Sequence, residues 1–187
     1  MLLAPGAGAD RNQDALVSLD EVATGAGADV TRMDFPYRKA GRRAPDRPRV
    51  LLAAVLDQVA ALAGPGPVIL GGRSMGGRIC SLAVAEGLGA GAPDVAGLLL
   101  VSYPLHPPGR PEKLRIEHFG ALRVPCLFVS GTRDAFGTRR ELEEHTAAIP
   151  GPVTHHWIEG KDHALRNTEA EVARAALAWL SGLGMPP

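Results

Sequence analysis

Short apolar runs alternate with longer segments of helical periodicity along the whole chain. The runs are rich in valine, isoleucine and leucine, as is typical of strands buried on both faces. They predict strands at residues 2–4, 29–35, 67–71, 95–102, 124–130 and 153–159. Helices are predicted at residues 13–24, 48–63, 75–87, 138–148 and 168–183, with a shorter one near 112–119. This alternation predicts an α/β fold, with a mostly parallel sheet of about six strands and helices on both faces.

Glycine and proline mark the boundaries between these segments. A helix is separated from the next strand by Gly64-Pro65-Gly66-Pro67 and, one unit later, by Gly91-Ala92-Pro93-Asp94. Thr168 followed by Glu171 has the spacing of a capping box at the start of the last helix. With no repeat and no linker in the pattern, we expect one domain over residues 1–187. The first strand directly follows Met1, so either a leading hairpin is absent or the natural start lies upstream.

The charge balance excludes several classes of protein. Lysine and arginine total 20, aspartate and glutamate total 20, and the formal net charge is zero. A nucleic-acid binder or a polybasic membrane module would need an excess of positive charge, so we expect neither kind of partner. No run of 18 apolar residues and no signal peptide is present, which predicts a soluble, cytoplasmic protein without a membrane partner. The sequence leaves the oligomeric state open.

Neither the cysteines nor the histidines suggest a metal or another cofactor. The two cysteines, Cys80 and Cys126, lack a Cys-x-x-Cys spacing, so we interpret them as buried reduced thiols. The six histidines show no His-x-His or His-Glu-x-x-His spacing. His155 and His156 are adjacent on a predicted strand, so at most one of them faces the core. We therefore expect no metal site and no cofactor.

The strongest chemical signal is a serine on a tight turn between a strand and a helix. The pattern Gly72-x-Ser74-x-Gly76 follows the predicted strand 67–71 and opens the predicted helix 75–87. Glycines two residues to either side of a serine let the strand and helix approach closely, and this turn exposes the serine hydroxyl. The amide of Met75 then points toward the site of a developing oxyanion, where the helix dipole favours negative charge. This context predicts that Ser74 is a nucleophile.

A serine hydroxyl needs a base and an orienting carboxylate to react near neutral pH. Asp134 follows the strand 124–130, and His163 follows the strand 153–159. Since the carboxyl ends of parallel strands share one edge of a sheet, we expect Ser74, Asp134 and His163 to converge there. In this hypothesis His163 is the general base and then the acid, and Asp134 holds the imidazole in the required tautomer. A second oxyanion amide is expected from the loop after the first strand, at Ala7.

The chain resembles the α/β-hydrolase family over nearly its whole length. Within that family it is similar to the small lidless proteins of the dienelactone-hydrolase type, in a subgroup with bacterial hydrolases, a testis-expressed protein and a regulatory subunit of the NSL chromatin complex. The resemblance rests on the segments 3–8, 33–37, 71–78, 103–108, 131–134 and 160–163. It implies the Ser, Asp, His order along the chain. The family commonly has His-Gly where this chain has Pro5-Gly6, and larger members carry a leading β-hairpin, so the strand 29–35 is expected at an edge.

Each candidate also has a structural interpretation. Ser74 fits a helix N-cap, Asp134 a turn, and His163 a solvated loop. Asp162 is an alternative carboxylate, but it is adjacent to His163 and poorly placed to orient it. The glycine-rich stretch 87–92 matches a dinucleotide fingerprint but follows a helix instead of a strand, so we interpret it as a loop. The basic residues between 38 and 49 form a solvated loop or steer an anionic substrate.

The gap between the fourth and fifth strands, about residues 103–123, is too short for a lid domain. We therefore expect a shallow cleft that accepts small to medium esters or thioesters. Its expected lining is Tyr37, Met75, Tyr103, Leu105, His106 and Phe136. The favoured function is a serine acyl hydrolase that acts on a small-molecule acyl substrate through an acyl-enzyme. The alternative is a non-catalytic protein that keeps the fold as an interaction or regulatory module.

Overall fold

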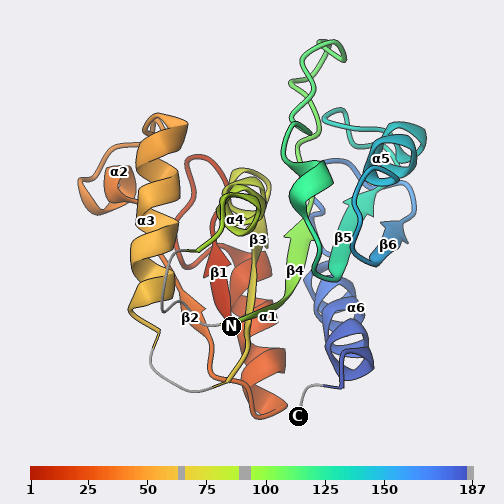
Figure 1. The fold of residues 1–187 in the computed structure, drawn as a ribbon. Coiled ribbons are helices and arrows are strands. Elements are labelled where there is room, and N and C mark those ends of the chain that lie inside the picture. The colour runs from red at the N-terminus through yellow and green to blue at the C-terminus, as the bar shows by residue number, and fades with distance from the viewer. Residues whose placement is uncertain (63–65, 89–93, 185–187) are drawn as a thin grey trace.

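A computed structural model describes residues 1–62, 66–88 and 94–184 of the chain. Six strands form one sheet in the order β2-β1-β3-β4-β5-β6, and every neighbouring pair runs parallel (Figure 1). The strands are β1 (Leu2–Ala4), β2 (Thr31–Arg32), β3 (Val68–Arg73), β4 (Val95–Val101), β5 (Cys126–Gly131) and β6 (Val153–Ile158). The helices are α1 (Asp14–Gly25), α2 (Pro36–Lys39), α3 (Pro48–Ala60), α4 (Met75–Glu86), α5 (Arg139–Thr146) and α6 (Glu169–Gly182), with a 3-10 helix η1 (Phe119–Ala121).

Successive residues of each central strand point to opposite faces of the sheet, as the period of a strand requires. Leu70, Leu98 and Phe128 pack with α3, α4 and α5 on one face. Ile69 and Leu99 pack with α1 and α6 on the other. Both faces are therefore covered, and the predicted three-layer α/β arrangement is confirmed.

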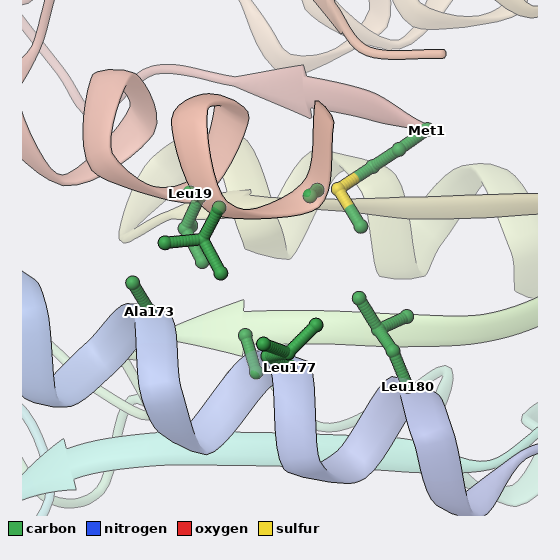
Figure 2. Close-up of a pocket in the computed structure, with 8 residues that line it drawn as sticks. Met1, Leu19, Ala173, Leu177 and Leu180 are labelled. Carbon is green, nitrogen blue, oxygen red and sulfur yellow. The ribbon is translucent and has the colours of Figure 1, made fainter. Parts of the chain in front are cut away.

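The helices α1 and α6 meet through small and aliphatic side chains. Figure 2 shows Leu19 of α1, Ala173, Leu177 and Leu180 of α6, and Met1 around the seam between them. The cavity that remains has a volume of about 10 Å³ and an apolar lining. A water molecule needs about that much space together with polar partners, so this seam is a packing contact.

All six predicted strands are present, although β2 pairs over only two residues of the predicted 29–35 and lies at the edge of the sheet. The predicted helix near 112–119 is wrong. Arg115 donates its amide to the carbonyl of Leu105 (2.9 Å) and accepts a bond from the hydroxyl of Tyr103 (2.6 Å). These tertiary bonds occupy backbone groups that a helix would use, and the only helical turn nearby is η1. The helix α2 was not predicted.

The predicted capping box at Thr168 is also wrong. Its hydroxyl donates to the carbonyl of Leu165 (2.7 Å), and no side-chain bond caps α6. Some predictions reach outside the described residues: the helix predicted to end at residue 63, the boundaries at 64–67 and 91–94, the glycine-rich stretch 87–92, and the single domain over 1–187.

The segment between β4 and β5 is described throughout and contains only η1, which agrees with the absence of a lid domain. Part of it, drawn in green, projects beyond the end of β4 (Figure 1).

Cys80 and Cys126 are free and buried, and burial raises the pKa of each thiol to about 12. None of the helices among the described residues is long and apolar enough to cross a membrane.

Candidate active site

Ser74 occupies the single-residue turn between the end of β3 and the start of α4. Its amide donates to the carbonyl of Val101 at 2.8 Å, and its φ is 50°. Residues other than glycine rarely adopt this conformation, at a cost of about 1–3 kcal/mol, so the surrounding structure has to hold it. Gly72 and Gly76 allow this because a Cβ on either would overlap the carbonyl oxygen of Ala4. The strand and helix thus approach β1 closely, and the serine is raised at the carboxyl edge of the sheet.

The structure brings together the three side chains of the expected triad. The Oγ atom of Ser74 lies 2.9 Å from Nε2 of His163. The Nδ1 atom of His163 lies 2.8 Å and 3.0 Å from the two carboxylate oxygens of Asp134. The side chain of Asp134 is 1% exposed and that of His163 is 19% exposed. Consecutive hydrogen bonds therefore join the hydroxyl, the imidazole and the carboxylate. The carboxylate is buried, whereas the serine and the imidazole are partly exposed to solvent.

The loops that carry Asp134 and His163 are fastened to each other. Arg133 donates its amide to the carbonyl of Lys161 at 2.8 Å. One oxygen of Asp134 also accepts the amide of Phe136 at 2.8 Å, which fixes the carboxylate. Asp162, the alternative carboxylate, instead accepts the amide of Ala164 at 3.0 Å. Asp134, rather than Asp162, is thus the carboxylate bonded to the imidazole.

Two further side chains contact His163. The ring of Phe136 stacks on the imidazole with centroids 4.0 Å apart and an interplanar angle of 28°. The guanidinium of Arg73 donates to the carbonyl of His163 at 2.7 Å. Burial lowers the pKa of Arg73, while the charges of Asp134 and Asp162 oppose that shift. Phe136 was expected in a substrate pocket. The contact of Arg73 could not be predicted from the sequence, because nothing local indicates a bond across 90 residues.

Ala7 and Met75 carry the two amides expected to face an oxyanion. Met75 is the first residue of α4, so its amide has no acceptor within the helix. Ala7 is exposed and lies after β1. Within the described residues, its amide donates to no group, whereas the amides on either side of it, Gly6 and Gly8, are both bonded. The two open amides are therefore available to a ligand.

Three of the expected pocket residues are buried in the core. Tyr37 and Leu105 are 0% exposed and Tyr103 is 1% exposed, so the prediction that they line a substrate pocket is wrong. A buried tyrosine can pack its ring in the core when its hydroxyl finds a hydrogen-bond partner. The hydroxyls of Tyr37 and Tyr103 each bond to a backbone group. His106 is nearly buried, and its Nε2 lies 3.5 Å from a carboxylate oxygen of Glu141. Of the expected lining residues, Phe136 stacks on His163 and Met75 directly follows Ser74.

The basic segment 38–49 is partly neutralised by neighbouring carboxylates. Arg38 lies 3.3 Å from Asp10, and Arg42 lies 2.7 Å from Asp46. These pairs balance two of the six basic residues of the segment, in keeping with the interpretation as a surface loop.

A protein-family model described as an alpha/beta hydrolase domain matches residues 1–179. An alpha-beta serine hydrolase homologue from Coxiella burnetii is 19% identical, with a TM-score of 0.75 over 96% of this chain and 83% of that one. The esterase domain of a Rhodothermus marinus protein is also 19% identical, with a TM-score of 0.71 over 96% and 85%. A monoacylglycerol lipase from Paleococcus ferrophilus is 14% identical, with a TM-score of 0.78 over 97% and 93%. At these identities the structural likeness shows a shared fold.

Proposed function

Because this chain belongs to the alpha/beta hydrolase domain family, we propose that it is a serine hydrolase that cleaves carboxylic esters or thioesters with Ser74, His163 and Asp134 as a catalytic triad. The observation that carries the proposal is the row of two hydrogen bonds, 2.9 Å from Ser74 to His163 and 2.8 Å from His163 to Asp134. These distances fall within the reach of a nucleophile–base pair and of a base and its orienting group.

In the first half of the reaction, Nε2 of His163 accepts the proton of Ser74 as Oγ attacks the acyl carbonyl carbon. The imidazolium that forms keeps its Nδ1–H bond to Asp134, whose buried carboxylate stabilises the new positive charge. The carbonyl π electrons move to oxygen, giving a tetrahedral intermediate. When this collapses, His163 returns its proton to the departing alkoxide or thiolate, and Ser74 is left acylated.

The oxyanion of the intermediate is stabilised by the amides of Ala7 and Met75. Both are open in the structure, and the amide of Met75 also lies at the positive end of the α4 dipole. Donors that are already oriented need no reorganisation as charge develops, and the loss of one such donor typically slows an enzyme by about 100-fold or more.

Water completes the reaction. His163 takes a proton from water as the hydroxide oxygen attacks the acyl carbon, and Oγ of Ser74 leaves with the proton that His163 then returns. The products are a carboxylic acid and the free enzyme. Stacking of Phe136 on the imidazole restricts rotation of the ring, so that Nε2 faces the serine in both halves.

The substrate we propose is a small or medium acyl ester or thioester. The segment between β4 and β5 contains no lid domain that would wall a long acyl tunnel. Among similar structures, one is named an esterase domain and one a monoacylglycerol lipase, which supports esters as the bond class. A non-catalytic interaction module would not need a buried carboxylate aligned on a histidine and a strained serine, so we do not favour that alternative.

The proposal predicts covalent labelling of Ser74 and ester turnover that depends on it. Purified wild-type protein and Ser74→Ala would be incubated with a fluorophosphonate probe, which reacts with activated serines, and assayed with p-nitrophenyl acetate, butyrate and palmitate. We expect labelling and turnover in the wild type only, with acetate or butyrate cleaved faster than palmitate. Absence of a Ser74-dependent adduct at neutral pH would overturn the proposal. Equal or faster turnover of palmitate would overturn the substrate range alone.

A further inference from the structure

Residues 5–9, which we call the oxyanion loop, carry four backbone amides, because Pro5 has none. Gly6 donates its amide to the side-chain oxygen of Gln13 at 3.0 Å. Gly8 donates to the hydroxyl oxygen of Tyr37 at 3.1 Å, and Ala9 donates to the carbonyl of Gly6 at 3.2 Å. Within the described residues, Ala7 is thus the one member of the loop whose amide is left open. Side chains from two other elements, α1 and α2, flank that open amide on both sides.

Gln13 is held rigidly where it meets the loop. It is the N-cap residue of α1, and its carbonyl accepts the amides of Leu16 (2.8 Å) and Val17 (3.1 Å). Its side chain makes no capping bond to its own helix and turns instead to Gly6. The guanidinium of Arg73 also approaches Gly6, since its Nη1 would lie 3.6 Å from a Cβ at that position. The first amide of the loop is therefore fixed from the α1 side.

Tyr37 is an equally rigid partner on the other side. Its side chain is 0% exposed, and its ring is stacked with that of Phe35 at a centroid separation of 6.3 Å. Burial raises the pKa of its hydroxyl, which stays protonated, and the hydroxyl oxygen accepts the amide of Gly8. A phenol on a buried ring has little rotational freedom, so its oxygen marks a fixed point for the loop.

Further bonds join the residues that follow the loop to the segment around Tyr37. Asp34 accepts the amide of Arg11 at 2.7 Å and its Nε at 2.6 Å, and Arg38 lies 3.3 Å from Asp10. The stretch 34–38 therefore fastens residues 8–11 at three places. These contacts give a role to part of the segment 33–37, which carries the family resemblance but holds no member of the triad.

We propose that Gln13 and Tyr37 are positioning residues that bond the amides of Gly6 and Gly8 and so hold the amide of Ala7 open toward the oxyanion. This inference rests on the proposed function, because it assigns the shaping of the oxyanion hole in that reaction. Pro5 has no N–H to donate, so the bonds that Gly6 and Gly8 make to Gln13 and Tyr37 are what orders this loop from outside it.

The test compares Tyr37→Phe and Gln13→Met with the wild type. Each variant removes the acceptor and keeps most of the side-chain volume. We expect each to lower kcat by about tenfold, less than the loss of an oxyanion donor, because the Ala7 amide is displaced and not deleted. KM should stay within about twofold, because the loss falls on the transition state. The Ki of a trifluoromethyl ketone, which forms a tetrahedral oxyanion on the serine, should rise in parallel with the fall in kcat/KM.

Tyr103→Phe is a matched control. The chain has two tyrosines, both buried with the hydroxyl bonded to backbone, but that of Tyr103 donates to the carbonyl of Arg115 and does not touch the oxyanion loop. We expect Tyr103→Phe to lower the melting temperature without changing kcat or the Ki of the ketone. Gln13 is half-buried at a helix terminus, so Gln13→Met keeps the test open if Tyr37→Phe fails to fold.

Unchanged kcat and unchanged ketone affinity in both variants, with a fall in melting temperature like that of Tyr103→Phe, would overturn the positioning role and leave the proposed function intact. A wild-type protein without Ser74-dependent labelling or turnover would overturn both.

Discussion

Gly76 lies two residues after Ser74, in the first turn of α4, where this helix passes over the end of β1. A Cβ on Gly76 would overlap the carbonyl oxygen of Ala4 and would lie 2.6 Å from that of Pro5. Both obstacles are backbone atoms and cannot rotate away. The requirement for glycine here is therefore steric, and it couples the turn around Ser74 to the first residue of the oxyanion loop.

At this scale we predict that Gly76→Ala lowers the free energy of unfolding by about 1–3 kcal/mol, the usual cost of forcing extra volume into a packed site. Turnover should fall as well, because the displaced backbone belongs to Ala4 and Pro5. Urea denaturation followed by circular dichroism measures the first effect and ester hydrolysis the second.

Gly25→Ala is the comparison variant. Gly25 is the last residue of α1, and a Cβ there would meet no atom within 4 Å. This substitution should leave turnover unchanged and raise stability by up to about 1 kcal/mol, because alanine loses less backbone entropy in a helix. If Gly76→Ala behaves like Gly25→Ala, the close approach to β1 does not constrain this position.

At the scale of elements, α5 and α6 begin with the same sequence pattern but different geometry. Thr138 and Glu141 exchange the two bonds of a capping box at the start of α5. At α6, Leu165 has a φ of 49°, and the hydroxyl of Thr168 turns back to its carbonyl. Glu171 lies instead 3.3 Å from His156 on β6. The pattern of a capping box is local, but the conformation of the preceding chain decides whether it forms.

We predict that Glu141→Ala costs about 0.5–1 kcal/mol of stability, because it removes one bond of the capping box and a negative charge at the helix N-terminus. Glu171→Ala, at the equivalent helix position, should change stability by less than about 0.5 kcal/mol, as is usual for a surface substitution. Chemical denaturation of the two variants side by side gives the comparison. Equal losses of stability in the two variants would contradict a capping box that forms at α5 and not at α6.

At the scale of the whole molecule, stability depends on a buried histidine outside the candidate site. His118 is 8% exposed, lies 2.7 Å from the hydroxyl of Ser81, and packs edge-on against Phe119. Burial, and to a smaller extent the positive charge of Arg78, lower its pKa to about 4, although the charge of Glu117 opposes the shift. In the unfolded chain a histidine titrates near about 6.5, so the unfolded state binds more protons between these pH values.

We predict that His118 stabilises the protein fully above about pH 6.5 and that this contribution is lost as the pH falls toward about 4. Because His118 binds at most one proton, the free energy of unfolding cannot fall by more than about 1.4 kcal/mol per pH unit from this group. Denaturation curves collected between these pH values for the wild type and His118→Gln measure it, since the carboxylates common to both proteins cancel. An identical pH dependence in the two proteins would show that His118 is not the titrating group.

Much of this protein could be predicted from short-range patterns. The alternation of apolar runs and helical segments determined the order of the elements and a sheet covered on both faces. The glycines around Ser74 determined a turn, because only glycine avoids the backbone of β1. The positions of Asp134 and His163 after strands predicted that they would meet at one edge, because parallel strands share their carboxyl edge.

Tertiary contacts decided the rest. The predicted helix near 112–119 is absent because Arg115 bonds to residues before it, and the predicted pocket tyrosines are buried because their hydroxyls reach backbone partners. The contacts from Tyr37 to Gly8 and from Arg73 to His163 span 29 and 90 residues. The sequence by itself determined which residues could react and at which edge they stand, since glycine sterics and strand polarity are local. Only the packed structure decided which side chains hold them in place, since a hydrogen bond between distant segments depends on how the layers come together.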